Sequence, residues 1–345
     1  MLLPPFSESD QNSFATFTHL LKQHSKPNEV HLFEIDATGK WSCHAHQSTP
    51  QNEWSINIVM QAPTLALVQG VMGAISDITG TAQFYLHPCS DIDSGLVGLV
   101  MPVNDELKPE QVESITSLTS TFNIDISVLK NAPRLTLPGL LVMDMDSTVI
   151  AVECIDEIAK LAGVGEQVSE VTERAMQGEL DFEESLRSRV KCLASLSESA
   201  LETVRQQLQL MPGLVRLVTQ LQSFGWRIAI ASGGFTYFAE HLQQRLGLDA
   251  AVANQLAIEN GVLTGDVIGD VVDAQVKAST VEQLAERWQI AMSQTVAMGD
   301  GANDLVMMSK ANLGVAFKAK PIVQQQADSA IQQGGLDVAL LYLRY

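Results

Sequence analysis

The sequence predicts an α/β protein: a doubly wound parallel sheet with a helical cap, preceded by a ferredoxin-like α+β domain. After residue 135, strand-like and helical stretches alternate, which is typical of parallel strands joined by helices. Before it, residues 55–130 follow the order β-α-β-β-α-β of a ferredoxin-like domain. We therefore expect one domain at residues 1–135 and a second at residues 136–345.

The expected boundary rests on a change in composition. No arginine precedes Arg134, and every arginine of the chain lies from that residue onward. Two prolines, Pro133 and Pro138, flank this point in the stretch "NAPRLTLPGL". Prolines at this density are typical of a linker between domains.

Composition narrows the classes of protein to consider. The 345 residues carry a formal net charge of −19 with a pI of about 4.6, which argues against nucleic acid or an anionic membrane as partner. No stretch approaches the ~18 apolar residues of a membrane span, and the N-terminus lacks the basic region of a signal peptide. Four cysteines without paired spacing indicate reduced thiols. Together these features predict a cytoplasmic protein.

The elements of the first domain have local signals. Apolar patterning predicts strands at residues 54–62, 81–87, 95–103 and 124–130. Helices are predicted at 63–78 and 108–122, with Pro63 and Pro109 near their starts. Residues 1–54 are expected to hold a helix and then a hairpin that turns at "DATGK". This order of elements resembles the ACT family of small regulatory domains.

The second domain is expected to alternate strands with helices. Strands are predicted at residues 140–144, 226–232, 251–256 and 295–300. Between the first two, residues 152–209 have the pattern of a helix throughout, which is too long for a simple crossover and predicts a cap. The pair Asn260-Gly261 predicts a hairpin turn.

Polar residues follow three of these strands at the point where each one ends. Asp144 and Asp146 follow the first strand, Ser232 and Gly233 end the second, and Asp300 and Asp304 follow the last. In open α/β sheets, ligands bind outside the carboxyl ends of the strands. Four carboxylates at one sheet edge would repel one another unless a cation neutralised them, and carboxylate oxygens suit Mg²⁺.

Other interpretations of these acids fit less well. The stretch "DMDSTVIAVECI" begins like a calcium loop, but Ile155 stands at its twelfth position, where a bidentate glutamate is required. A receiver-type signalling domain would also gather acids at a strand end, but it would have no large cap. Solvated loop acids could account for one such motif, but poorly for three at strand ends.

The motifs and their order carry a resemblance. "DMDST", "SGG", Lys277 in "DAQVKA" and "GDGANDLVMM" resemble the four motifs of the haloacid dehalogenase-type phosphatases, over about residues 138–330. The cap stretches "ECIDEIAKLAG" and "TERAMQGELDFEESLRSRV" resemble the phosphoserine phosphatases within that family. The resemblance implies a haloacid dehalogenase-like core and hydrolysis of a phosphomonoester.

The resemblance also implies roles for the carboxylates. Asp144 would be the nucleophile that forms an aspartyl-phosphate. Asp146 would protonate the leaving oxygen and later accept a proton from the attacking water. Mg²⁺ would be held by Asp144, by the backbone carbonyl of Asp146 and by Asp300.

A second group of residues would surround the phosphoryl group. By the same resemblance, Ser232, the amide of Gly233 and Lys277 would hold its non-bridging oxygens. Asn303 would contact the substrate. The supporting residues would be Ser147 and Asp304, with Asp304 orienting Lys277 or the waters of the metal.

Specificity falls to the cap, because the core chemistry suits any phosphomonoester. Phosphoserine carries an ammonium and a carboxylate, so the cap should offer an acid and a base. The resemblance implies Glu153 as the acid, and the base is either Arg187 or Arg189. Arg187 follows Glu183 by four residues and can pair with it on an exposed helix face.

Helical spacing favours Arg189 as the base. It lies seven residues after Phe182 and three after Leu186, so these side chains share the inward face of the helix. An inward guanidinium needs a carboxylate from the ligand. The resemblance selects Arg189 as well, and it places Met176 and Phe182 in the lining of the pocket.

The predicted function is therefore Mg²⁺-dependent hydrolysis of O-phospho-L-serine to L-serine and phosphate, the last step of serine biosynthesis. One rival is a phosphotransferase that passes the phosphoryl group to a hydroxyl other than water. Another is a regulatory protein in which the ACT-like half senses an amino acid. The ligand of residues 1–135 is not predicted, and the sequence leaves a homodimer open.

Overall fold

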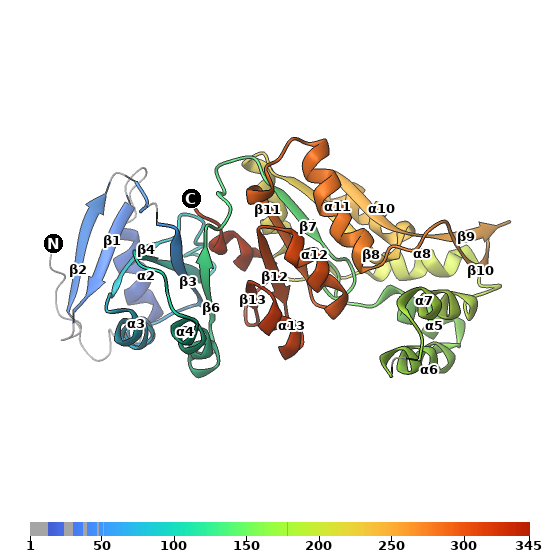
Figure 1. The fold of residues 1–345 in the computed structure, drawn as a ribbon, viewed down its shortest axis with the longest axis horizontal. Coiled ribbons are helices and arrows are strands. Elements are labelled where there is room, and N and C mark those ends of the chain that lie inside the picture. Colours follow the sequence, from blue (N-terminus) through green and yellow to red (C-terminus); the bar gives the residue numbers. More distant parts are fainter. Residues whose placement is uncertain (1–12, 24–29, 37–39, 47, 51, 178) are drawn as a thin grey trace. The chain divides into compact units, whose positions relative to one another are not determined.

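The computed structural model describes residues 13–23, 30–36, 40–46, 48–50, 52–177 and 179–345 (Figure 1). The chain forms two compact units: Met1–Thr136 together with Ser329–Tyr345, and Leu137–Asp328. Among the described residues, no helix is long and apolar enough to cross a membrane.

The first unit contains the predicted β-α-β-β-α-β order. Its elements are β3 (Trp54–Gln61), α3 (Leu65–Thr79), β4 (Gln83–Leu86), β5 (Leu96–Val103), α4 (Pro109–Phe122) and β6 (Asp125–Lys130). The side chain of Thr64 caps the start of α3, one residue after Pro63, and Gly80 ends that helix with a φ of 73°. Pro109 opens α4, as predicted.

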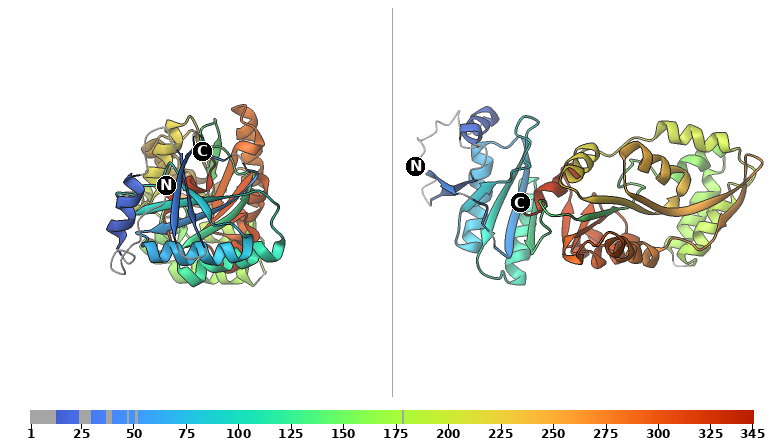
Figure 2. Two further views of the ribbon diagram at one scale, coloured as in Figure 1. Left: turned by 90° about the vertical axis from the view of Figure 1, so that its left-hand side faces the viewer. Right: turned by 90° about the horizontal axis from the view of Figure 1, so that it is seen from above.

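The strands of this unit form one antiparallel sheet in the order β2-β1-β4-β5-β3-β6. A hairpin of β1 (Val30–Ile35) and β2 (Trp41–His46) extends it, after α2 (Phe14–Gln23). The predicted turn at "DATGK" is closed by a bond from the Asp36 amide to the Lys40 carbonyl, while residues 37–39 lie outside the described residues. Helices α3 and α4 cover one face of the sheet (Figure 2).

The last residues of the chain return to this first unit. The carboxylate of Asp125, which is 1% exposed, accepts the backbone N–H groups of Gln332, Gln333 and Gly334. The Asn57 amide donates to the carbonyl of Leu341 at 2.6 Å. The prediction placed 136–345 in one domain, whereas the structure groups Ser329–Tyr345 with the first unit. These bonds join residues 207 and 284 positions apart, so no local sequence pattern predicts them.

The second unit has a doubly wound sheet. Within this unit the strands run in the order β10-β9-β8-β7-β11-β12, and all of them except β10 are parallel. They are β7 (Leu140–Met143), β8 (Arg227–Phe235), β9 (Ala250–Glu259), β10 (Val262–Ile268), β11 (Thr295–Gly299) and β12 (Leu313–Phe317). The antiparallel edge strand β10 follows a turn with positive φ at both Asn260 (53°) and Gly261 (76°), as the Asn-Gly pair predicts.

Helices lie on both faces of this sheet (Figure 2). From the central strand β7, the chain moves one way through β8 and β9, and later the other way through β11 and β12. Right-handed crossovers place the connecting helices of the two halves on opposite faces. These helices are α9 (Leu214–Ser223) and α10 (Thr236–Leu246) on one face, and α11 (Ala274–Arg287) and α12 (Leu305–Lys310) on the other. α13 (Pro321–Gln326) follows β12.

The insertion after β7 is a helical cap, as predicted for residues 152–209, and it contains four helices. They are α5 (Cys154–Ala162), α6 (Gly165–Met176), α7 (Phe182–Lys191) and α8 (Glu198–Gln207). Local signals separate these helices: Gly163 ends α5 with a φ of 71°, and Asp181 caps α7 in a capping box with Glu184. The two connections of the cap pair with each other, since the Ala151 amide donates to the Gln209 carbonyl at 3.0 Å.

Candidate active site

A cleft of about 580 Å³ lies in the second unit, where the carboxyl ends of β7, β8 and β11 meet. β7 is the strand at which the chain reverses its direction across the sheet, which is where α/β sheets bind ligands. The predicted site residues that line the cleft are Asp144, Asp146, Glu153, Phe182, Arg189, Ser232, Gly233, Lys277, Asp300 and Asn303. The cap supplies Phe182 and Arg189 from α7 and Glu153 from the start of α5.

A buried lysine organises the floor of the cleft. Lys277, in the first turn of α11 and 1% exposed, places its Nζ 2.8 Å from Oδ1 of Asp144 and 2.8 Å from Oδ1 of Asp304. Burial alone would lower the pKa of Lys277, but the two carboxylates raise it above its usual range. The lysine therefore stays charged and holds Asp144 in a fixed orientation.

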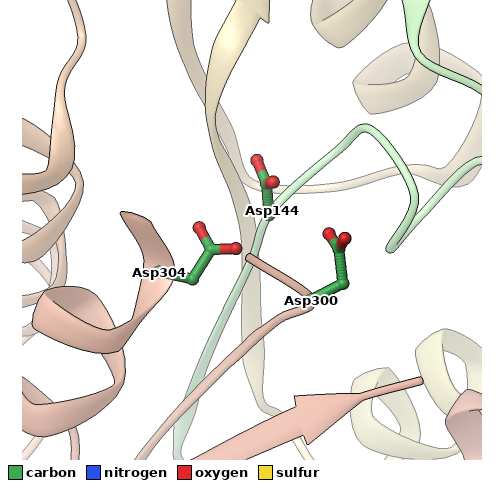
Figure 3. A group of neighbouring side chains, drawn as sticks. All are labelled: Asp144, Asp300 and Asp304. Carbon is green, nitrogen blue, oxygen red and sulfur yellow. The ribbon is translucent and has the colours of Figure 1, made fainter. Parts of the chain in front are cut away.

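Three carboxylates converge beside this lysine (Figure 3). Asp144, Asp300 and Asp304 each offer an oxygen, and these atoms lie within 4.8 Å of one another. Burial, with the nearby charge of Asp144, raises the pKa of Asp300 to about 6. The hydroxyl of Thr148 donates to Asp300 at 3.2 Å. One lysine leaves this group with excess negative charge, so its oxygen donors fit a divalent metal ion.

Asp146 has a different environment from Asp144. Its Oδ1 accepts the backbone N–H of Cys154 at 3.3 Å. Burial raises the pKa of Asp146 to about 8, and the charges of Glu153 and Asp144 add to this effect. A carboxyl group with this pKa is largely protonated at neutral pH and can therefore act as a proton donor.

The end of β8 forms the wall opposite the acids. Ser232 is 1% exposed, and its Oγ accepts the backbone N–H of Gly234 at 2.9 Å. A larger residue at position 233 would force Phe182 to shift, because a Cβ there would lie 2.8 Å from Cζ of the Phe182 ring. The loop thus brings backbone close to the cap and lets a ligand lie against both.

On the cap side, Glu153 and Arg189 have opposite charges and differ in their hydrogen bonds. The Ser147 hydroxyl donates to Oε1 of Glu153 at 2.8 Å. The Nε of Arg189 is buried and has no hydrogen-bond partner among the described residues. Burial lowers the pKa of Arg189, although nearby acids partly offset this. A buried guanidinium nitrogen without an acceptor indicates that a ligand supplies one.

Arg187 lies on the same helix but is fully engaged elsewhere. Its Nε is 2.8 Å from Oε1 of Glu183, as the four-residue spacing predicts. Its two terminal nitrogens donate to the carbonyls of Val267 and Gly269, both at 3.3 Å. Of the two candidate bases, therefore, the structure places Arg189 in the cleft and Arg187 against the end of β10.

The expected site residues Met176 and Asp304 are not among the described residues that line the cleft. The side chain of Met176 lies outside the described residues, although its backbone ends α6. Asp304 stands behind the cleft, where it binds Lys277 and the Gly301 amide. Sequence reasoning missed Thr148, whose place in the "DMDST" motif next to Ser147 was the available signal.

The fold and this arrangement of acids, lysine and serine match a known class of enzyme. The family model of the haloacid dehalogenase-like hydrolases matches residues 138–312. The chain belongs to this family. Within it, the chain is 56% identical over 220 residues to a phosphoserine phosphatase of Vibrio cholerae, covering 64% of this chain and 67% of that protein. A phosphoserine phosphatase of Haemophilus influenzae is 55% identical over 237 residues, covering 69% of this chain and 76% of the relative.

Solved structures of phosphoserine phosphatases are also similar to this chain. The unliganded structure of a probable phosphoserine phosphatase from Vibrio cholerae is 44% identical with a TM-score of 0.71, covering 84% of this chain and 86% of that one. A substrate-bound phosphoserine phosphatase is 40% identical with a TM-score of 0.57, covering 60% of this chain and 99% of the other.

Proposed function

We propose that this chain is a phosphoserine phosphatase that hydrolyses O-phospho-L-serine to L-serine and phosphate, the last step of serine biosynthesis. One observation carries the choice of substrate: the cleft has Glu153 and Arg189 on the cap side, and the Nε of Arg189 has no hydrogen-bond partner in the part of the chain that the structure describes. A ligand with a phosphate at one end, and an ammonium and a carboxylate at the other, meets both sets of groups. The names of the relatives support the same substrate.

In the first half of the reaction, Asp144 attacks phosphorus and forms an aspartyl-phosphate. Lys277 orients this carboxylate through the bond to Oδ1. Asp146, with its pKa raised to about 8, gives its proton to the serine oxygen as the bond to phosphorus breaks.

In the second half, the same carboxylate works in reverse. Asp146, now ionised, takes a proton from a water molecule, which attacks phosphorus and releases phosphate from Asp144. Because one residue serves as acid and then as base, its pKa must lie near the working pH. Its burial and the neighbouring acids keep it there.

The remaining residues hold the substrate. Ser232, the amide of Gly233 and Lys277 bind the phosphoryl oxygens, and Asn303 contacts the substrate beside them. Glu153 binds the ammonium and Arg189 the carboxylate, while Phe182 covers the pocket. A magnesium ion held by Asp144, the backbone carbonyl of Asp146 and Asp300 would offset the charge of the phosphoryl group.

The test is phosphate release from matched substrates, with magnesium and with a chelator. Phosphoserine should be hydrolysed much faster than phosphoethanolamine, which lacks only the carboxylate, or 3-phosphonooxypropanoate, which lacks only the ammonium. Chelation should abolish all three activities. Equal rates on phosphoserine and phosphoethanolamine would show that the cleft does not recognise the carboxylate, and phosphoserine would then be the wrong substrate.

The first unit supports a further part of this proposal. Its ferredoxin-like strand order is that of an ACT-like regulatory domain, so we assign residues 1–135 to such a domain. Equilibrium dialysis of the full-length protein with a panel of amino acids tests this assignment.

A further inference from the structure

Asn254, in β9, is a buried polar residue that lies outside the lining of the cleft. It is 1% exposed, and both ends of its side-chain amide are engaged. Its Nδ2 donates to the carbonyl of Gly233 at 2.8 Å, and its Oδ1 accepts the backbone N–H of Val272 at 2.8 Å. The two backbone partners fix the orientation of the amide, because a carbonyl can only accept and an N–H can only donate.

The bond to the Gly233 carbonyl lies where the backbone pairing of β8 with β9 is irregular. The parallel pairing of β8 with β9 is regular up to Ala231 and Val252, then shifts before Phe235 pairs with Asn254. The shift falls on Ser232, Gly233 and Gly234, where β8 enters the cleft. A side chain on β9 thus supplies a partner where the backbone ladder is irregular.

This bond also affects the surroundings of the Ser232 hydroxyl, which is predicted to bind phosphate. The carbonyl of Gly233 and the N–H of Gly234 belong to one planar trans peptide, so they point in opposite directions. Fixing the carbonyl on Asn254 therefore aims the N–H at Oγ of Ser232, which accepts it at 2.9 Å. With its oxygen occupied in this way, the Ser232 hydroxyl keeps its own proton for a ligand.

The bond from the Val272 amide fixes the start of α11, the helix that carries Lys277. Val272 directly precedes Asp273, the N-cap of α11, whose side chain accepts the Val276 amide at 2.8 Å. The amide of Lys277 donates to the Asp273 carbonyl at 3.0 Å. Holding Val272 thus sets the position from which Lys277 reaches the acids of the cleft.

We propose that Asn254 is a positioning residue that sets the distance between Ser232–Gly234 and Lys277, the two sides of the phosphoryl cradle. The inference rests on the proposed phosphatase function. Only a side chain with one donor and one acceptor on a short planar group satisfies both bonds. Asn254→Asp keeps the shape but turns the donor into an oxygen that faces the Gly233 carbonyl. Asn254→Ala removes both bonds and serves as a second variant.

The kinetic signature separates positioning from stability. The cradle matters most as charge develops on the phosphoryl oxygens, so both variants should lose kcat, about 100-fold for a displacement near 1 Å. The loss should be equal for phosphoserine and phosphoethanolamine, with KM changed less than threefold. Thr295→Val is the matched control: Thr295 is buried, donates to Met292 at 2.7 Å and accepts from Asn312 at 3.0 Å, at the end of β11 away from the cleft. It should lower Tm and leave kcat unchanged.

A binding measurement distinguishes failure of this inference from failure of the proposed function. Orthovanadate with magnesium should raise the Tm of the wild-type protein and of Thr295→Val, and should raise that of the Asn254 variants much less. This readout holds even if phosphoserine is not the substrate. The inference is overturned if the Asn254 variants keep kcat within threefold, or keep the full vanadate shift, while losing as much Tm as Thr295→Val.

Discussion

The substrate carboxylate should be recognised by Arg189 and not by Arg187. The two side chains lie on one helix, yet the Nε of Arg189 is buried and finds no partner among the residues described, whereas Arg187 binds Glu183 and two carbonyls. Arg189→Ala should therefore remove a charged contact that only substrates with a carboxylate make. Arg187→Ala removes contacts that every substrate leaves untouched.

The size of the effect follows from how enclosed the contact is. Losing one partner of a buried, hydrogen-bonded charge pair typically costs about 2–5 kcal/mol. Arg189 is only half-buried, so the lower end applies, and ~2 kcal/mol corresponds to about 30-fold in kcat/KM. The Arg187–Glu183 pair is exposed, and such pairs contribute about 0.3–0.5 kcal/mol.

The assay is the ratio of kcat/KM for phosphoserine to that for phosphoethanolamine in both variants. In Arg189→Ala the ratio should fall about 30-fold, mainly through phosphoserine. In Arg187→Ala it should stay within about twofold. A selective loss in Arg187→Ala, with none in Arg189→Ala, would refute the assignment and exchange the roles of the two arginines.

Three further outcomes follow from the structure. Asp144→Asn should abolish phosphate release while leaving the circular dichroism spectrum unchanged, because an amide is a poor nucleophile; substantial turnover would exclude the covalent mechanism. Burial raises the pKa of Asp300 from 3.8 to about 6, so its proton competes with a metal below that pH, and magnesium should raise Tm more at about pH 7.5 than at about pH 5. An equal rise at both pH values, or an unchanged rise in Asp300→Asn, would remove Asp300 from the metal site. Deleting residues 332–345 removes three backbone N–H donors of the Asp125 carboxylate together with buried side chains such as Leu336 and Tyr342, which should cost the first unit at least about 3 kcal/mol. Hydrogen exchange of β3 and β5 should then accelerate, and unchanged exchange would contradict this account.

Local signals predicted much of this architecture. The ferredoxin-like order followed from apolar patterns and from Pro109, and the β9–β10 turn from Asn260-Gly261. The acids and the serine at the strand ends were predictable because the carboxyl ends of parallel strands meet at one edge of a sheet, whereas Glu153, Lys277 and Asn303 were expected only from the resemblance to the family. The distances between these residues and the hydrogen bonds that each one makes could not be predicted, because they depend on packing between segments far apart in sequence.

The errors have physical causes too. The helical cap over 152–209 was predicted without the bounds of its four helices, although Gly163 and the Asp181 capping box mark two of those bounds locally. β12 was missed because "LGVAF" is an apolar run of five residues, and a run this short does not distinguish a strand from a buried helix segment. Asn254 was missed because one amide in an apolar strand looks like any other polar residue until both of its partners are known.

The return of residues 329–345 to the first unit sets an order on synthesis. Met1–Thr136 emerges from the ribosome first. The backbone N–H groups that donate to the Asp125 carboxylate emerge only after all of Leu137–Asp328. Domains generally fold as units during translation, with the N-terminal one first. The N-terminal unit therefore stays incomplete until the end of the chain has emerged, by which time strands β7 to β12 have all been synthesised. A nascent chain whose residues beyond 328 have not yet emerged should hold these strands behind an unfinished first unit.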